Sequence, residues 1–123
     1  MNEQIQPMTL YEQIGDEQLQ LLIHQFYDRV FRSAIIGPLF NKTDADTIKK
    51  KQYYFLTQFL GGPARYNEAY GHPRMRMRHM PHKITAEAKD EWLKLMHESI
   101  QTLAISDPLK KALYDCFPKI AAH

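Results

Sequence analysis

The sequence predicts an all-α fold, and three observations carry that prediction. Apolar residues recur every three or four positions in several long segments, which is the period of a helix that buries one face. Helix-capping residues precede those segments. No stretch alternates apolar and polar residues as a half-buried strand does. At 123 residues the chain has the length of one domain. We therefore expect an N-terminal tail over residues 1–8 and one folded domain over residues 9–123.

Two helices are predicted near the N-terminus. Thr9 followed by Glu12 fits a capping box for a short helix over residues 10–14, which Gly15 ends. The next helix should run from about Asp16 to Arg32. Its buried stripe is expected to consist of Leu19, Leu22, Ile23, Phe26, Val30 and Phe31, with Tyr27 at its edge.

A third helix is predicted after a break at Gly37 and Pro38, with Thr43 or Asp44 as its cap. Residues Ile48, Phe55, Leu56 and Phe59 share one face of it. Gln52 falls on the same face, so an amide occupies an expected core position. The Gly61-Gly62-Pro63 sequence ends this helix.

Residues 61–84 show no sustained period, and a connection this long within a small domain is usually functional or disordered. Thr85 then caps a long helix with an inward face of Ala88, Trp92, Leu95, Met96, Ser99 and Leu103. Asp107 and Pro108 begin the last helix. There we expect Leu109, Ala112, Leu113, Cys116, Phe117 and Ile120 to face inward, with Pro118 kinking or ending it.

Composition limits the class of protein. The formal net charge is +2, from 16 basic and 14 acidic residues, which is not the excess typical of a dedicated nucleic-acid binder. The single Cys116 forms no internal disulfide and reads as an inert buried thiol. There is neither a signal-like N-terminus nor an apolar run of about 18 residues. We expect a cytoplasmic protein that does not span a membrane.

The segment GHPRMRMRHMPHKI, residues 71–84, mixes imidazoles, cations and methionines. Its histidines suggest a zinc site, but no cysteine or carboxylate completes a recognisable ligand spacing. Its arginines suggest an RNA contact, but no aromatic platform accompanies them. A solvated basic loop is the plainest interpretation. A fourth hypothesis is haem, which needs an imidazole for iron, an apolar wall and cations for its propionates. His79, Met75 and Met80, and Arg78 offer these three features.

Three polar side chains on predicted inward faces bear on this choice. Tyr27, Gln52 and Trp92 could each be explained alone by ordinary core packing. A phenol, an amide and an indole together are more polarity than a plain core of this size should contain. They indicate a shared polar guest.

At this point the chain resembles the truncated haemoglobins, specifically their second group, the O-type. The similarity runs from about Leu10 to Leu103. It rests on Phe26-Tyr27, Gly37-Pro38-Leu39-Phe40, Gly61-Gly62-Pro63, Gly71-His72-Pro73-Arg74, Met77-Arg78-His79, and Trp92 with Met96-His97. The resemblance implies a shortened globin fold, a two-over-two helical sandwich around haem b (iron protoporphyrin IX).

The resemblance also implies roles for individual residues. His79 would be the proximal iron ligand, and Tyr27, Ile48, Gln52 and Trp92 would form the distal ligand site, with Ile48 as an apolar gate. The residues expected to contact haem are Phe40, Lys51, Gln52, Phe55, Met75, Arg78, His79, Ile84 and Trp92. Among these, Arg78 and Lys51 would meet the propionates.

The expected function is binding of oxygen and other diatomic ligands, with slow oxygen release. The alternative is a haem-based redox enzyme, peroxidase-like or detoxifying nitric oxide, and the sequence does not separate the two. Because the chain has no flavin or nicotinamide module, a catalytic cycle would need an external reductase. We expect no nucleic-acid partner and a monomer or weak dimer.

Overall fold

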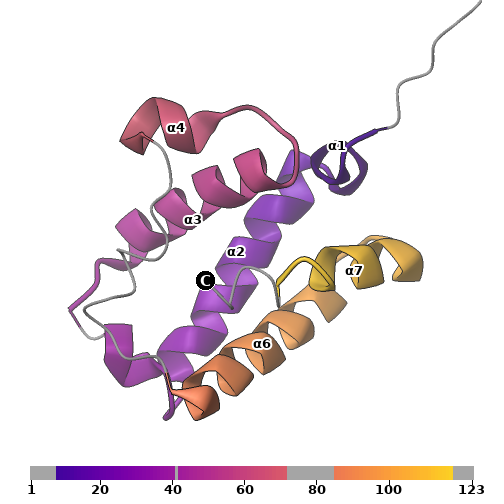
Figure 1. Cartoon of the computed structure of the whole chain (residues 1–123). Helices are drawn as coiled ribbons and strands as arrows, with labels where there is room; N and C mark the ends of the chain where they lie inside the picture. The colour runs from indigo at the N-terminus through magenta and orange to yellow at the C-terminus, as the bar shows by residue number, and fades with distance from the viewer. Residues whose placement is uncertain (1–7, 41, 72–84, 118–123) are drawn as a thin grey trace, which may run out of the picture.

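Helices make up all the regular structure in the described parts of the chain. The computed structural model describes residues 8–40, 42–71 and 85–117, and within these ranges it contains no strand. The elements are α1 (Leu10–Ile14), α2 (Asp16–Arg32), the 3-10 helix η1 (Gly37–Phe40), α3 (Ala45–Phe59), α4 (Arg65–Tyr70), α6 (Ala86–Gln101) and α7 (Asp107–Tyr114) (Figure 1). The predicted all-α class is confirmed.

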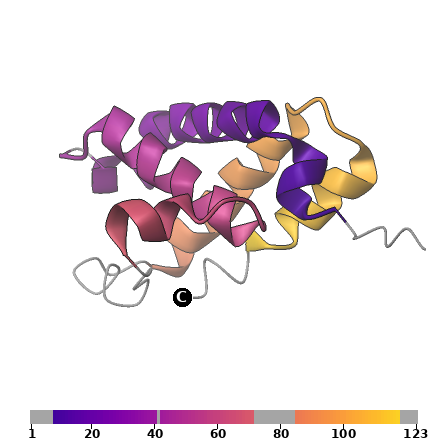
Figure 2. The same ribbon diagram turned by 90° about the horizontal axis from the view of Figure 1, so that it is seen from above.

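Helix α2 is the centre of the arrangement. It packs against α3 on one side and against α6 on the other (Figure 1), while α4 covers α3 and α7 packs on α6 and α1. Figure 2 shows α2 lengthwise along the top, with α3 and α6 both below it. Helices α3 and α6 make few contacts with each other in the described part of the chain.

Burial of one face of α2 explains this central position. Leu19, Leu22, Phe26 and Val30 have no exposed surface, and Leu56 of α3 and Ile100 of α6 meet them in one core cluster. Each fully buried side chain of this size contributes about 1.5–3 kcal/mol relative to an exposed one. The predicted stripe of α2 is thus its core face, except at Phe31.

Side-chain caps define where the helices begin. Thr9 Oγ1 accepts a hydrogen bond from Glu12 N at 3.1 Å, and Glu12 Oε1 accepts one from Thr9 N at 2.9 Å, which is the predicted capping box. Asp44, and not Thr43, caps α3 through Thr47 N at 2.9 Å. Thr85 caps α6 through Ala88 N at 3.0 Å.

The end of α3 is pressed against α1. Tyr11 N donates to Leu60 O at 3.0 Å. A Cβ on Gly61, whose φ is +94°, would lie 2.8 Å from Thr9 Cβ, and one on Gly62 would lie 2.7 Å from the Tyr11 ring. The two glycines are therefore required by the close approach of the chain.

One α-helix was not predicted. Residues 65–70 form α4 inside the stretch expected to be irregular. No side chain caps its N-terminus; instead Gln58 of α3 accepts from Asn67 N at 2.9 Å and donates to Asn67 Oδ1 at 3.1 Å. The contact that stabilises α4 is made with another helix, so the local sequence does not predict this element.

The predicted burial of three residues is wrong. Phe31 is 38% exposed and Phe59 is 47% exposed, because each lies at the margin of its helix stripe where no described element covers it. Cys116 is only partly buried, and its Sγ lies 3.4 Å from Ala112 O. Leu113 and Phe117 are buried as predicted, α7 ends at Tyr114, and Ile120 lies outside the described residues.

Asp16 joins the first four α-helices through hydrogen bonds. Its carboxylate accepts from Tyr11 at 2.7 Å, Tyr53 at 2.5 Å and Gln20 at 2.7 Å, while Arg65 lies 3.3 Å away. Burial alone would raise the pKa of Asp16, but these donors together lower it to about 2. Asp16 therefore holds α3 and α4 in place as an anion.

None of the helices in the described part of the chain is both long enough and apolar enough to cross a lipid bilayer.

Candidate functional site

Phe26 of α2 brings together two of the predicted site residues. Its ring centroid lies 5.0 Å from that of Tyr27 and 5.1 Å from that of Trp92, both in edge-to-face geometry. Edge-to-face pairs of aromatic rings are favourable beyond the area they bury. Tyr27 of α2 and Trp92 of α6 thus both pack against one fully buried ring.

Phe40 reaches the same cluster from η1. Its ring centroid lies 6.4 Å from that of Tyr27 and 6.4 Å from that of Phe31. The turn that returns Phe40 to α2 passes so close that a Cβ on Gly37 would lie 3.2 Å from Val30 O. A small residue at position 37 therefore allows Phe40 to approach Tyr27.

The polar groups of this cluster have no partners within the described part of the chain. The side chains of Tyr27, Gln52 and Trp92 make no hydrogen bond to any residue in 8–40, 42–71 or 85–117. No fully buried side-chain nitrogen or oxygen among the described residues lacks a partner. The Tyr27 side chain is only 4% exposed, and its burial raises the pKa of the phenol, which keeps the hydroxyl protonated as a donor.

Helix α3 contributes a mixed wall. Ile48 and Phe55 are half-buried against the core, and Gln52 lies between them in sequence with similar exposure. The Phe55 ring stacks on Phe59 at 5.7 Å. Lys51 extends toward α4, where its Nζ lies 5.3 Å from the Tyr70 ring centroid.

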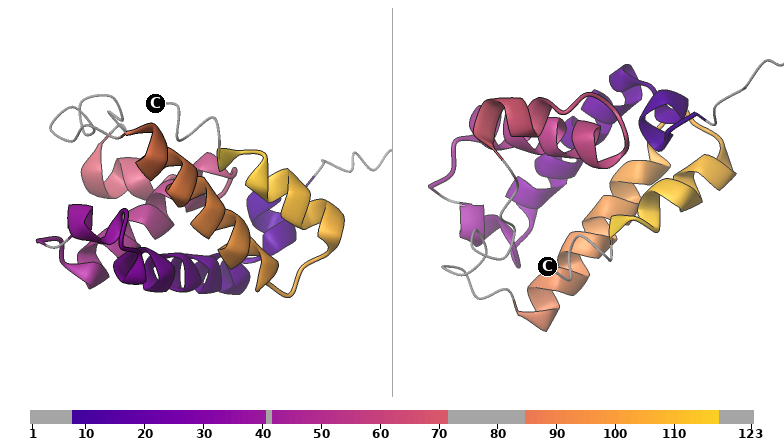
Figure 3. Two further views of the ribbon diagram at one scale, coloured as in Figure 1. Left: turned by 90° about the horizontal axis from the view of Figure 1, so that it is seen from below. Right: turned by 45° about the horizontal axis from the view of Figure 1, so that its top comes forward.

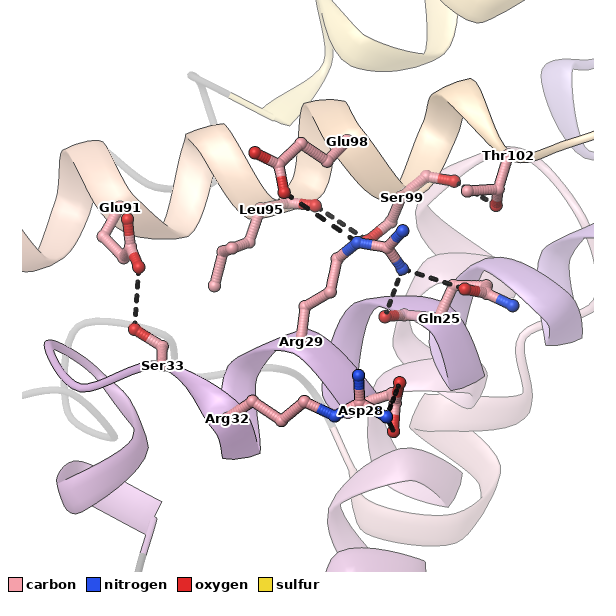
Figure 4. Close-up of polar contacts among 10 residues, drawn as sticks. All are labelled: Gln25, Asp28, Arg29, Arg32, Ser33, Glu91, Leu95, Glu98, Ser99 and Thr102. Atoms are coloured by element: carbon pink, nitrogen blue, oxygen red, sulfur yellow. Dashed lines mark hydrogen bonds and ion pairs between the residues drawn. The ribbon is translucent and has the colours of Figure 1, made fainter.

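A row of polar contacts fixes α6 on α2 (Figure 4). Ser33 Oγ, just after α2, donates to Glu91 Oε2 at 2.7 Å. Arg29 donates to Gln25 Oε1 at 2.8 Å and lies 3.9 Å from Glu98 Oε1. Because Glu91 directly precedes Trp92, the Ser33 contact sets how far along α2 the indole lies.

Several predicted residues lie outside the described residues. These are Met75, Arg78, His79 and Ile84, and their assigned roles remain predictions. His24 and His97 are exposed, as expected for surface histidines. In the part of the chain that is described, no three potential ligands converge on a metal site.

Sequence reasoning missed three contributors to the cluster. Phe26 was assigned only to the core, although it orients both Tyr27 and Trp92. Phe31 contacts Tyr27 at 6.1 Å, and its spacing of four residues from Tyr27 was an available signal. The Ser33–Glu91 bond joins residues 58 positions apart and gives no local signal.

Comparison with known proteins assigns the family. The family model described as bacterial-like globin matches residues 9–123. A group 2 truncated haemoglobin of Bacillus subtilis (strain 168) is 38% identical over 113 residues, which are 92% of this chain and 85% of that protein. The chain belongs to the group II truncated haemoglobins.

Solved structures agree with this assignment. The X-ray structure of a truncated oxygen-avid haemoglobin from Bacillus subtilis matches with a TM-score of 0.87 and 37% identity, covering 94% of this chain and 98% of that one. A haemoglobin from Chloroflexus aurantiacus matches with a TM-score of 0.87 and 34% identity, covering 94% and 96%. The truncated globin fold is therefore confirmed for this haemoglobin.

Family membership supports haem-based binding of small diatomic ligands as the general function. The described residues of this truncated haemoglobin fit a haem group in two respects. Phe31, Phe40, Ile48 and Phe55 offer apolar surface that no described element fully covers. Tyr27, Gln52 and Trp92 offer donors with no partner among the described residues, which suits a polar ligand on the haem.

Proposed function

We propose that this truncated haemoglobin binds oxygen at a haem b whose iron is held by His79, and that it releases oxygen slowly. The observation that carries the proposal is the set of three donors, Tyr27, Gln52 and Trp92, that lack hydrogen-bond partners in the described residues. Donors without a partner among the described residues are available to a ligand that accepts from them.

Haem iron supplies reversible binding of a diatomic molecule. The chain's own residues determine what happens around that molecule. Phe40 and Phe55 would contact the flat faces of the porphyrin, and Arg78 and Lys51 would meet its carboxylates. Ile48, being apolar, would restrict access of water to the ligand side.

The three donors would then stabilise the ligand electrostatically. A bound diatomic molecule gains negative charge, so each donated hydrogen bond should contribute on the order of 1.5–3 kcal/mol. The high pKa of the buried Tyr27 phenol keeps its proton available at all ordinary pH values. Donors from α2, α3 and α6 would hold the ligand from different directions.

Oxygen dissociation tests this proposal. Tyr27→Phe and Trp92→Phe should each speed oxygen release by about ten- to a hundredfold, the kinetic equivalent of one lost charge-assisted bond. Tyr114→Phe on α7 is the matched control and should leave the rate unchanged. Stopped-flow measurement on the haem-loaded protein gives the rates, and unchanged release in both pocket variants would refute the distal-donor assignment.

A redox activity is the second candidate, and the same three donors favour it. Hydrogen bonds to a peroxide polarise its O–O bond, so the pocket is also suited to peroxide reduction or to reaction of oxygen with nitric oxide. Either activity requires an electron donor outside the chain. Turnover of peroxide and of nitric oxide, measured beside simple oxygen dissociation, separates an enzyme from a carrier.

A further inference from the structure

Four of the seven tyrosines form a chain of ring contacts on α3 and α4. Tyr66 and Tyr70 have ring centroids 5.1 Å apart, Tyr70 and Tyr54 are 6.3 Å apart, and Tyr54 and Tyr53 are 5.8 Å apart. Helix α4 lies beside α3 in both Figure 1 and Figure 3, and the contact between Tyr54 and Tyr70 joins the two helices. The chain of tyrosines is not explained by ligand binding at Tyr27.

One end of this chain meets the proposed haem pocket. The Tyr66 ring packs edge-to-face on Phe55 at 5.7 Å, and Phe55 is one of the residues assigned to the haem wall. Tyr66 is 3% exposed, whereas Tyr70, the next ring, is 38% exposed. The rings therefore lead from the pocket wall to the protein surface in two steps.

Tyr53, at the opposite end of the row, is less suited to reaction with outside molecules. Its hydroxyl donates a hydrogen bond to Asp16 at 2.5 Å, and Arg65 donates one to the Tyr53 oxygen at 2.8 Å. Burial, followed by the bond to Asp16, raises the pKa of Tyr53 to about 12. The Tyr53 phenol bonds helices to one another, so Tyr70 is the accessible ring.

Two lysines lie beside the exposed ring and its neighbour. Lys50 Nζ lies 5.6 Å from the Tyr54 ring centroid, and Lys51 Nζ lies 5.3 Å from that of Tyr70. Positive charge beside an exposed ring attracts anions from solution and does so less at high salt. Molecules that approach Tyr70 should therefore be selected for negative charge.

We propose that Tyr70, connected to the pocket through Tyr66, is a surface oxidation site at which the haem-loaded protein takes electrons from bulky, preferably anionic one-electron reductants. The proposal rests on haem binding at the proposed site. Electron transfer falls steeply with distance, so rings in contact give a faster route than a jump through the protein from solvent to the pocket.

The reaction balances with hydrogen peroxide as the oxidant. Peroxide accepts two electrons and two protons in the pocket and becomes two molecules of water. Each electron leaves a tyrosine, whose phenol releases its proton at the same time and becomes a neutral radical. The reductant returns one electron to Tyr70, which regains a proton from solvent, so two reductant molecules are oxidised for each peroxide.

Conservative substitutions on the ring chain test the site. Tyr70→Phe and Tyr66→Phe keep the rings and the fold but remove the phenols that lose an electron. With peroxide and ferrocyanide as reagents, both variants should oxidise ferrocyanide several-fold more slowly than the wild type, and Tyr114→Phe should not. Oxygen dissociation should be unchanged in Tyr70→Phe, since that ring does not contact the ligand.

A second readout does not depend on turnover. When peroxide is added in the presence of a nitroso spin trap, the trap should become attached to Tyr70 of the wild type. Peptide mass spectrometry should detect this adduct in the wild type and not in Tyr70→Phe. Labelling at Tyr114 instead, or an unchanged ferrocyanide rate in both ring variants, would overturn the proposal. Purified protein that takes up no haem would contradict the proposed function itself, which separates the two failures.

The charge preference has its own matched pair. Lys50→Gln should raise the concentration of ferrocyanide needed for half-maximal rate while leaving the rate with neutral hydroquinone unchanged. Lys94→Gln, an exposed lysine on α6, should change neither. Equal effects of both variants, or of both reductants, would contradict selection for anions at Tyr70.

Discussion

Ser33 and Glu91 join the end of α2 to α6 through one hydrogen bond of 2.7 Å, immediately before the pocket tryptophan. Ser33 Oγ also accepts from the backbone N–H groups of Ile35 and Ile36, each at 3.2 Å. The same hydroxyl thus closes the end of α2 and positions α6. A polar contact on the outside of the helix pair thereby determines where an aromatic donor lies inside it.

Loss of this contact should loosen Trp92. Ser33→Ala should lower the free energy of unfolding by about 1 kcal/mol, because the bond is charge-assisted but partly exposed. Since Trp92 is the only tryptophan, its fluorescence in the haem-free protein should shift to longer wavelength as water reaches the indole. Arg32→Ala breaks only an exposed ion pair with Asp28 and should change neither quantity; equal effects of both substitutions would contradict the positioning role.

His79 is expected to bind the iron, although it lies outside the described residues. His79→Ala should greatly accelerate transfer of haem to a haem-scavenging protein, because the iron would lose the protein ligand assigned to it. His24→Ala, at an exposed position on α2, should retain haem like the wild type. A five-coordinate ferrous spectrum that survives His79→Ala unchanged would assign the ligand to another residue.

Much of the helical framework could be predicted because its signals are local. Thr9, Asp44 and Thr85 each precede a helix and bond to a backbone N–H three residues later, which sequence spacing alone reveals. The stripe of α2 likewise follows from a period of 3.6 residues. Such features depend on neighbours within one turn and need no knowledge of the fold.

Other features could not be predicted because they depend on distant residues. Periodicity shows which side chains share a face, but it does not show whether another element covers them, and so Phe31 and Phe59 were wrongly expected to be buried. Helix α4 depends on Gln58 rather than on its own cap. Helix faces suggested that Tyr27 and Trp92 share a polar guest, whereas the place of Phe40 beside them was implied only by the family resemblance. Phe26 was expected in the core stripe, but its contact with both Tyr27 and Trp92 was not predicted.

Acid should weaken the junction around Asp16. Its pKa is about 2 in the folded protein and about 3.8 when exposed, so the folded state favours the anion. The contribution of the Asp16 anion to the free energy of unfolding is complete above pH 4 and is lost as the pH falls from about 4 toward 2. Urea unfolding should be measured for the wild type and Asp16→Asn from pH 6 down through this window. Their unfolding free energies should differ by about 1 kcal/mol at pH 6 and converge at low pH; solvent screening limits the size of the difference.

Asp46 provides the control for this pH dependence. It is an exposed carboxylate in the first turn of α3, and within the described residues it bridges no two helices. Asp46→Asn should leave the acid slope of the unfolding free energy close to that of the wild type. A persistent slope in Asp16→Asn would show that other carboxylates dominate the acid response.

Gly62, which follows α3, should be more sensitive to substitution than Gly71, which follows α4. A Cβ at position 62 would lie 2.7 Å from the Tyr11 ring and 2.9 Å from Thr57 O, and the backbone oxygen of a buried helix residue moves only with the helix. We expect Gly62→Ala to lower the free energy of unfolding by about 1–3 kcal/mol, as overpacking does. Gly71→Ala meets no atom within 4 Å and strains only a φ of +77°, which should cost about 1 kcal/mol. Urea midpoints of the two variants decide the matter: if Gly71→Ala proves the more damaging, the contact between α1 and the end of α3 is looser than these distances require.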